Sequence, residues 1–242
     1  MRIIFVRHGD PDYVNDTLTE KGIREANCLG ERIKDWKIDD VYCSPLGRAK
    51  KTAEIGLKYK DKTPVIYDWM KEFFIPVIDP ETGRERIAWD FMPKYWTEEK
   101  ILFDKDNWYE APVMKTGNIK EAYLDMCRNL DELLAKYGYI REGDYYRTEN
   151  GGDGKPESDK TIVIFCHLGI TFAMMSHLLG LSPLVLWQGF FVAPTSVTVL
   201  CTEERVPNEA FFRVQVMGDT THLHDGNEPI SGSGYFAEIF NN

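Results

Sequence analysis

The sequence predicts an α/β fold in which helices cover both faces of a mostly parallel sheet, a three-layer αβα sandwich. Two observations indicate this class. Short β-rich apolar runs alternate with segments of helical periodicity along the 242-residue chain, an order typical of a parallel sheet. The run 161–166 is apolar along its length, as a strand covered on both faces should be. We expect residues 1–242 to form one domain, because a single α/β domain of this size is common.

The chain begins with a predicted strand over 2–6, a β-rich apolar run that stops at polar residues. A helix is predicted over about 19–36, because Thr19 is a suitable N-cap and apolar residues recur after it at helical spacing. Those apolar residues are Ile23, Ala26, Leu29 and Ile33.

A second short strand is predicted over 41–44. Ser44-Pro45 then opens another helix, since proline suits the first helical turn. A third short strand is predicted over 65–67. The segment 74–117 combines prolines with many aromatic residues, and we expect it to be an insertion of loops and short helices over the core.

The second half of the chain starts with a predicted helix over about 118–137. Residues 141–160 are rich in Gly, Asp, Glu and Lys, which indicates a polar, mobile loop or an exposed hairpin. The strand 161–166 is followed by a predicted helix over about 170–180. Two late strands, 196–201 and 211–216, are expected to pair with each other.

Composition excludes several classes of function. The formal net charge is −10, which argues against nucleic acid and against anionic membrane surfaces, because both need a basic face. No apolar stretch of membrane-spanning length occurs, and the first apolar run is too short for a signal peptide. A small anionic substrate remains compatible, since a few arginines make a local positive pocket. The oligomeric state stays open, a homodimer included.

The five cysteines, Cys28, Cys43, Cys127, Cys166 and Cys201, are odd in number and widely spread. Without paired spacing they do not indicate zinc, and reduced thiols in a cytoplasmic protein fit best. The run from His222 to Asp225 contains two histidines, but such a pair in a tail is more typical of a loop than of a metal site. We therefore expect neither a metal nor a cofactor.

Two of the predicted strands end in a histidine that glycine follows within two residues. These are Arg7-His8-Gly9 and His167-Leu168-Gly169. The carboxyl ends of parallel strands meet at one edge of the sheet, where ligands of open α/β folds bind. Each strand leads to a helix, and helix N-termini favour anions. Arg48 lies one turn into the helix that Ser44-Pro45 opens, so it belongs to the same edge.

This set of side chains suits phosphoryl transfer through a histidine. A neutral imidazole, fixed in one tautomer, is a competent nucleophile. Arginine offers forked donors that match the oxygens of a phosphoryl group, and preorganised charge of this kind is usually the largest catalytic contribution. A carboxylic acid must protonate the leaving oxygen.

At this point the sequence resembles a known family. Arg7-His8-Gly9, the segments 18–22 and 44–53, and the late His167 occur in the order found in the histidine phosphatase superfamily, in the phosphoglycerate mutase-like branch 1. The resemblance covers roughly 1–73 and 118–201, and the insertion lies outside it. It implies the phosphoglycerate mutase-like αβα fold and metal-independent phosphomonoesterase activity on a small phosphorylated metabolite, through a phosphohistidine.

Carried over residue by residue, the resemblance implies that His8 is the phosphorylated nucleophile. Arg7, Arg48 and His167 would bind the phosphoryl oxygens, with His167 also in the catalytic set. Glu72 follows a short strand, where this branch often supplies its acid, and would protonate the leaving group. We also expect Asn15, in the loop after His8, to contact phosphate.

Departures from the family pattern bear on the reaction. Phosphoglycerate mutases have Glu-Ser-x-Trp-Asn after Arg-His-Gly, whereas this chain reads Asp10-Pro11-Asp12. That difference favours hydrolysis over mutase chemistry. Two alternatives remain: a cofactor-dependent mutase, and a non-catalytic regulatory protein that binds phosphate esters. The aromatic insertion is either a satellite core or a lid that gives the substrate pocket an apolar wall, and Trp89 and Trp108 are the residues that test this.

Overall fold

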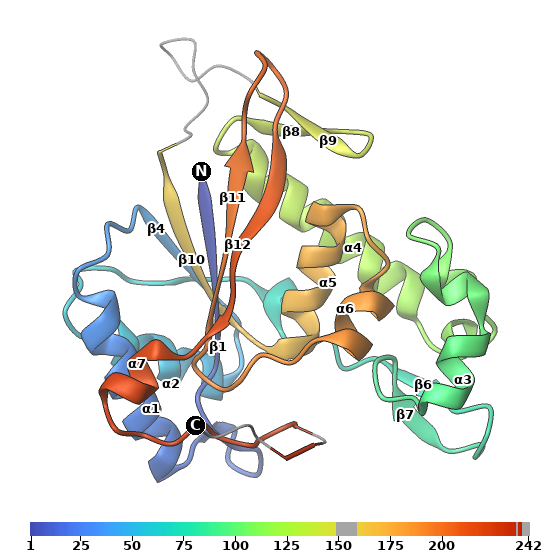
Figure 1. Ribbon diagram of the computed structural model, residues 1–242, viewed down its shortest axis with the longest axis horizontal. Helices are drawn as coiled ribbons and strands as arrows, with labels where there is room; N and C mark the ends of the chain where they lie inside the picture. The colour runs from blue at the N-terminus through green and yellow to red at the C-terminus, as the bar shows by residue number, and fades with distance from the viewer. Residues whose placement is uncertain (149–158, 236, 239–242) are drawn as a thin grey trace.

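The computed structural model describes residues 1–148, 159–235 and 237–238, and a six-stranded sheet forms its centre (Figure 1). The strands lie in the order β12-β11-β1-β10-β4-β5. They are β1 Arg2–Arg7, β4 Asp40–Cys43, β5 Val65–Ile66, β10 Thr161–Cys166, β11 Val197–Glu203 and β12 Phe211–Asp219. Strands β1, β10, β4 and β5 run parallel, whereas β11 pairs antiparallel with β1 and with β12. The mostly parallel sheet and the pairing of the two late strands are confirmed.

Helices cover both faces of this sheet. The long ones are α1 Glu20–Ile33, α2 Gly47–Gly56, α4 Ile119–Ala135 and α5 Leu168–Leu179. Along β10, Ile162 and Ile164 pack in one apolar cluster with α4 and α5, and Val163 and Phe165 pack in another with α1 and α2. This division follows from the alternation of side chains along a strand. Figure 1 shows the two helix pairs on opposite sides of the sheet, so the αβα sandwich is confirmed.

The segment 74–117 is built from short elements. These are β6 Pro76–Ile78, β7 Glu85–Ile87, α3 Pro93–Glu98 and the 3-10 helices Lys100–Phe103, Trp108–Glu110 and Met114–Thr116. Short helices were expected here, but the β6–β7 hairpin was not. Trp108 is fully buried, with its ring 5.4 Å from that of Trp187 and 5.0 Å from that of Tyr123. Part of the aromatic content is therefore core.

Several local expectations need correction. Helix α2 begins at Gly47 with Leu46 as N-cap, so Pro45 lies before the helix and not in its first turn. Thr19 does cap α1, accepting from the Gly22 N–H, but Ile23 is exposed while the other predicted apolar positions are buried. Residues 139–148 form a hairpin, β8 Tyr139–Glu142 and β9 Tyr145–Thr148, which agrees with the hairpin alternative for 141–160; residues 149–158 of that segment lie outside the described residues. Four more short elements also went unpredicted: helices α6 Pro183–Gly189 and α7 Thr221–Asp225, and the paired strands β2 Pro11–Asp12 and β3 Thr17–Leu18.

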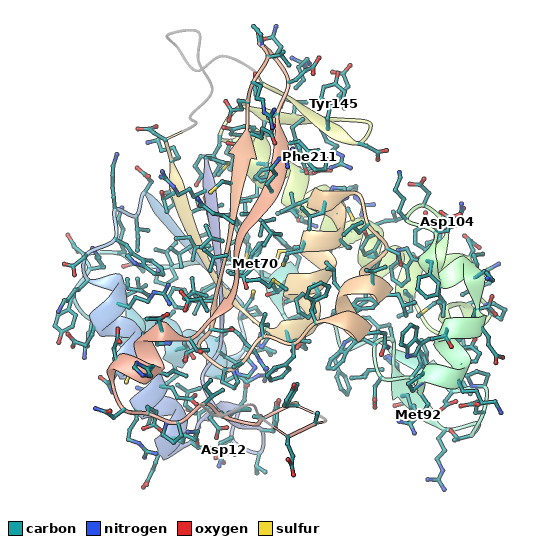
Figure 2. All side chains as sticks on the ribbon, in the orientation of Figure 1. Asp12, Met70, Met92, Asp104, Tyr145 and Phe211 are labelled. Atoms are coloured by element: carbon teal, nitrogen blue, oxygen red, sulfur yellow. The ribbon has the colours of Figure 1, made fainter. Side chains whose placement is uncertain are left out.

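Packing also fixes the segment that carries Glu72. A 3-10 turn, Asp68–Met70, follows β5, and Met70 is fully buried in the cluster beneath α4 and α5. Figure 2 shows Met70 in the middle of the molecule, whereas Asp12 and Met92 lie at its periphery. With Met70 anchored, Glu72 is directed toward the ends of the central strands.

Candidate active site

His8 follows the last residue of β1 and is held by its neighbours. Its backbone N–H donates to the Cys166 carbonyl at 3.0 Å, and its ring Nδ1 lies 2.7 Å from the Gly9 carbonyl oxygen. A carbonyl oxygen only accepts, so Nδ1 carries the ring proton and Nε2 keeps its lone pair. Burial, reinforced by the charge of Arg7, holds the pKa of His8 well below its usual range. The imidazole is therefore neutral, with Nε2 as the nucleophilic atom.

His167 lies beside His8 because their strands are in register. Arg7 pairs with Cys166, so the next residue on each strand is a histidine, and the two ring centroids are 5.0 Å apart. His167 Nε2 is 2.7 Å from Ser44 Oγ, and that oxygen already accepts from the Leu46 N–H. We assign the Ser44 hydroxyl as the donor to Nε2, which places the ring proton of His167 on Nδ1.

That Nδ1 is buried and has no hydrogen-bond partner in the described part of the chain. Burial, and then the proximity of His8, Arg48 and Arg7, keeps the pKa of His167 well below its usual value. The neutral ring of His167 still presents one N–H to a ligand, without added charge.

The glycine after each histidine allows a close approach. A Cβ on Gly9 would lie 2.8 Å from the Gly22 carbonyl oxygen of α1. A Cβ on Gly169 would lie 2.8 Å from both Glu72 Oε1 and Trp89 Nε1. The spacing of histidine and glycine in both motifs therefore reflects packing around the site.

Arg7 is the last residue of β1, and its guanidinium is buried. Nη1 donates to the Val192 carbonyl at 2.7 Å and Nη2 to the Ser233 carbonyl at 3.1 Å. Its Nε is buried without a partner among the described residues. The ring of Phe191 lies 5.5 Å from the guanidinium carbon, which gives the cation an aromatic neighbour.

Arg48 lies in the first turn of α2 and contacts the loop after His8. Its Nη1 donates to Asp16 Oδ1 at 2.7 Å, and the other Asp16 oxygen accepts from the Gly47 N–H at 2.6 Å. Asp16 adopts a φ of +47°, a left-handed conformation that Asp tolerates better than most residues. The Nε of Arg48 is buried without a partner in the described chain.

The side chain of Glu72 contacts the N-terminus of α5. Its Oε1 accepts from the N–H groups of Phe73 and Ile170 at 2.8 and 2.9 Å, and Oε2 accepts a longer bond from Gly169 at 3.3 Å. Burial raises the pKa of this carboxyl, and the backbone donors and Arg7 only partly oppose that effect. Oε2 is less occupied, so it is the better position for a transferable proton.

Asn15 is exposed and is not brought to the other predicted residues. Its amide donates to Asp12 Oδ2 at 2.7 Å within the turn, and its backbone N–H also bonds to Asp12. The neighbouring Asp16 makes the contact with Arg48 instead.

An anion fits the remaining arrangement. Six buried side-chain N or O atoms of the described chain lack a hydrogen-bond partner, and three belong to this site: Arg7 Nε, Arg48 Nε and His167 Nδ1. Buried donors without partners are rare, and in an active site they indicate a missing ligand. Three N–H donors beside a neutral nucleophile suit the oxygens of a phosphoryl group.

Two positioning residues, Ser44 and Asp16, escaped sequence reasoning. Ser44 stands in a segment that the sequence singled out, but only as a helix start. Asp16 gives no local signal except that it follows Asn15 in a polar turn, since its role depends on α2 packing against that turn.

Two other kinds of feature bear on function: clusters of metal ligands and membrane-spanning helices. The described residues contain no cluster of three or more His, Cys, Asp or Glu side chains arranged for a metal ion. His222 and His224 lie in the short helix α7 and not in a loop, and the first is buried while the second is 93% exposed. No helix in the described ranges is long and apolar enough to cross a bilayer.

The chain is similar in sequence and in fold to known phosphatases. Residues 3–101 match the family model described as histidine phosphatase superfamily, branch 1. A probable phosphatase of Schizosaccharomyces pombe is 22% identical, over 92% of this chain and 95% of its own. An adenosylcobalamin/alpha-ribazole phosphatase of Salmonella typhi is 23% identical, over 78% of this chain and 84% of its own.

Among solved structures, a mutant phosphoserine phosphatase from Entamoeba histolytica, in complex with phosphoserine, superimposes with a TM-score of 0.59. It is 20% identical and is covered over 98% of its length, with 92% of this chain matched. That identity supports the fold. Over residues 3–101 the chain is therefore similar to branch 1 of the histidine phosphatase superfamily, and over most of its length it is similar to curated phosphatases.

Proposed function

We propose that this phosphatase is a metal-independent phosphomonoesterase that acts on a small phosphorylated metabolite through a phosphohistidine at His8. The observation that supports this most is the neutral His8 ring, whose Nδ1 donates to the Gly9 carbonyl, next to three N–H donors that have no partner among the described residues. Its curated relatives of near-full length include a probable phosphatase, which is in line with hydrolysis.

The first step transfers the phosphoryl group. His8 Nε2 attacks phosphorus and forms the P–N bond, while the P–O bond to the leaving group breaks and its electron pair goes to the leaving oxygen. Glu72 gives its proton to that oxygen, so the product departs as an alcohol. Arg7, Arg48 and the Nδ1–H of His167 donate to the three phosphoryl oxygens, where charge must be stabilised throughout.

The second step returns the enzyme to its starting state. Water attacks phosphorus, and the Glu72 carboxylate accepts a proton from that water. The P–N electron pair returns to His8 Nε2, and inorganic phosphate leaves. Burial raises the pKa of Glu72, which favours the protonated acid that the first step needs.

The test is a panel of phosphomonoesters, including p-nitrophenyl phosphate and sugar phosphates, assayed with a metal chelator present. The wild type and a His224→Ala control should release phosphate, since His224 is an exposed histidine outside the site. His8→Ala should lose about 10⁴-fold or more, as removal of a nucleophile does. Full activity in His8→Ala, or strict dependence on added metal, would overturn the proposal.

The same panel separates the alternatives. Isomerisation of a phosphoglycerate without release of phosphate would identify a mutase. Binding of phosphate esters without turnover or phosphohistidine would identify a regulatory protein. The replacement of the mutase pattern by Asp10-Pro11-Asp12 favours phosphate release.

A further inference from the structure

The buried histidine of α7 has no part in the chemistry described so far, although it connects to the nucleophile. Its Nε2 lies 3.1 Å from Thr195 Oγ1, in a buried contact between segments 27 residues apart. Thr195 precedes β11, and its backbone N–H is shared between the carbonyl oxygens of Arg7 and His8, at 3.1 and 3.2 Å. His222 is therefore one side chain away from the backbone that carries the nucleophile.

Thr195 occupies an unusual conformation. Its φ is +57°, in the left-handed region, where a β-branched residue is a genuine outlier. Strained residues of this kind persist only when their surroundings hold them, and they concentrate at functional sites. Here the strain directs the Thr195 N–H at both carbonyls, so the conformation of one residue limits the movement of the end of β1.

The hydrogen-bond directions along this path are defined. The Thr195 hydroxyl donates to the Pro194 carbonyl at 2.8 Å, so Oγ1 accepts from His222. Arg32 Nη1 lies 3.4 Å from His222 Nδ1 and only donates, which places the ring proton on Nε2. Burial, with a contribution from Arg32, lowers the pKa of His222 to about 4, so the ring stays neutral with one N–H.

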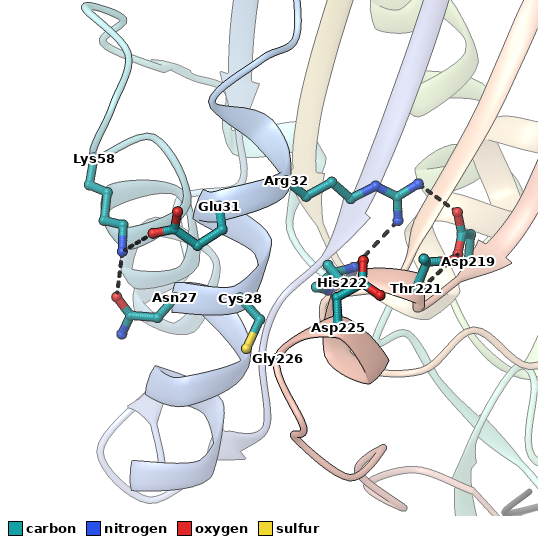
Figure 3. Close-up of a pocket in the computed structure, with 10 residues that line it drawn as sticks. All are labelled: Asn27, Cys28, Glu31, Arg32, Lys58, Asp219, Thr221, His222, Asp225 and Gly226. Atoms are coloured by element: carbon teal, nitrogen blue, oxygen red, sulfur yellow. Dashed lines mark hydrogen bonds and ion pairs between the residues drawn. The ribbon is translucent and has the colours of Figure 1, made fainter.

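Arg32 is fixed in turn by Asp219 at the end of β12, with 2.5 Å between Nη2 and Oδ2. Figure 3 shows Asp219, Arg32 and His222 in sequence along the wall of a cavity between α1 and α7. The cavity has a volume of about 550 Å³. The path from Asp219 to Thr195 thus runs from this outer cavity to the back of the active site.

We propose that His222 is a positioning residue for the phosphatase reaction, which holds Thr195 in its left-handed conformation and thereby fixes the backbone of Arg7 and His8. The inference rests on the proposed function of His8. It assigns a role to a histidine outside the set of phosphoryl-binding side chains, on a helix that packs against α1.

The effect should fall on turnover more than on binding. A nucleophile displaced by a fraction of an ångström loses its alignment with phosphorus, and a displacement of about 1 Å costs about 10²-fold. We expect His222→Leu, which fills the space without a donor, to lower kcat about tenfold to a hundredfold. Inhibition by inorganic phosphate should change less than about twofold, because the side-chain donors of Arg48 and His167 remain in place.

Controls separate positioning from a general structural effect. His222→Gln keeps an N–H donor on its terminal nitrogen and should recover a large part of kcat. His224→Leu alters the exposed histidine of the same helix and should behave as wild type. Thr195→Val removes the hydroxyl and should reproduce the loss of kcat. Thr195→Ser retains the hydroxyl and should have a higher kcat than Thr195→Val.

The deciding measurement is a double-mutant cycle on kcat with His222→Leu and Thr195→Val. If His222 acts through Thr195 Oγ1, the double variant is no slower than the worse single variant. Multiplicative losses, or an unchanged kcat in His222→Leu, would overturn the inference. If His222→Leu fails to fold, equal kcat values for Thr195→Val and Thr195→Ser would overturn it instead. The activity of His8→Ala tests the proposed function separately. A failure of the positioning role of His222 can therefore be told apart from a failure of the proposed function.

Discussion

Glu25 makes the stability of this protein depend on pH in a direction opposite to that of most carboxylates. It lies on α1 with its side chain fully buried, and its Oε2 accepts from the Asp10 N–H at 2.7 Å. Its Oε1 has no hydrogen-bond partner in the described chain, and the nearest cation, Lys21 Nζ, is 3.8 Å from it. Burial therefore raises the pKa of Glu25 from 4.5 to about 7.

The sign follows from proton binding. Between about pH 4.5 and pH 7 the folded state keeps a proton on Glu25 that the unfolded state has lost. Stability is therefore greatest below the unfolded pKa and falls as the pH rises through this window. One pKa unit corresponds to about 1.4 kcal/mol, so ionised Glu25 costs about 3 kcal/mol at about pH 8.

Glu25→Gln removes this dependence, because its amide oxygen still accepts from Asp10 and carries no charge. Urea unfolding should show the variant more stable than wild type by up to about 3 kcal/mol at about pH 8, and close to it at about pH 4.5. Glu132→Gln, an exposed glutamate on α4, is the matched control and should leave the pH slope unchanged. Equal pH slopes for wild type and Glu25→Gln would refute the reasoning.

Three further predictions concern the site. Glu72→Gln should lower kcat/KM, which reports the step that expels the leaving group, by about 10²–10⁴-fold for alkyl phosphates and much less for p-nitrophenyl phosphate, whose leaving group needs no proton; steady-state kcat/KM values on both substrates check this, and equal losses would exclude Glu72 as the acid. Ser44→Ala removes the donor to His167 and should reduce kcat/KM roughly twofold to tenfold, which is the value of one hydrogen bond. Inhibition by phosphate should weaken as well. An unchanged inhibition constant would argue against the assigned tautomer of His167. Trp89→Ala, next to Glu72 and Gly169, should alter substrate preference. Trp108→Ala should instead lower the free energy of unfolding by about 3–5 kcal/mol and leave substrate preference unchanged. A substrate screen together with thermal melts distinguishes the effects of the two tryptophan variants.

Sequence reasoning succeeded where the signal is local. The two histidines follow apolar strands, and strand pairing alone then brings them together, so Arg7, His8 and His167 could be placed without knowing any side-chain contact. Thr19 was likewise identifiable as a cap, because capping depends on a few neighbouring residues.

It failed where a role depends on tertiary contact. Asn15 was expected to contact phosphate because it lies in the loop after His8, but its amide bonds to Asp12, and only the packing of α2 brings the neighbouring Asp16 to Arg48. The aromatic insertion could not be divided into core and site from composition, although Trp108 is buried and Trp89 borders Glu72. The contact of His222 with Thr195 joins residues that are 27 positions apart, and no local sequence pattern predicts it.

The most direct test of the account is to identify the phosphorylated intermediate. The wild type is mixed with a ³²P-labelled phosphomonoester, quenched within one turnover under basic conditions that preserve phosphohistidine, and mapped by peptide analysis. The account predicts label on Nε2 of His8, formed and lost at rates compatible with kcat and absent in His8→Ala. Label on another residue, or full turnover with no labelled protein at any time, would contradict it.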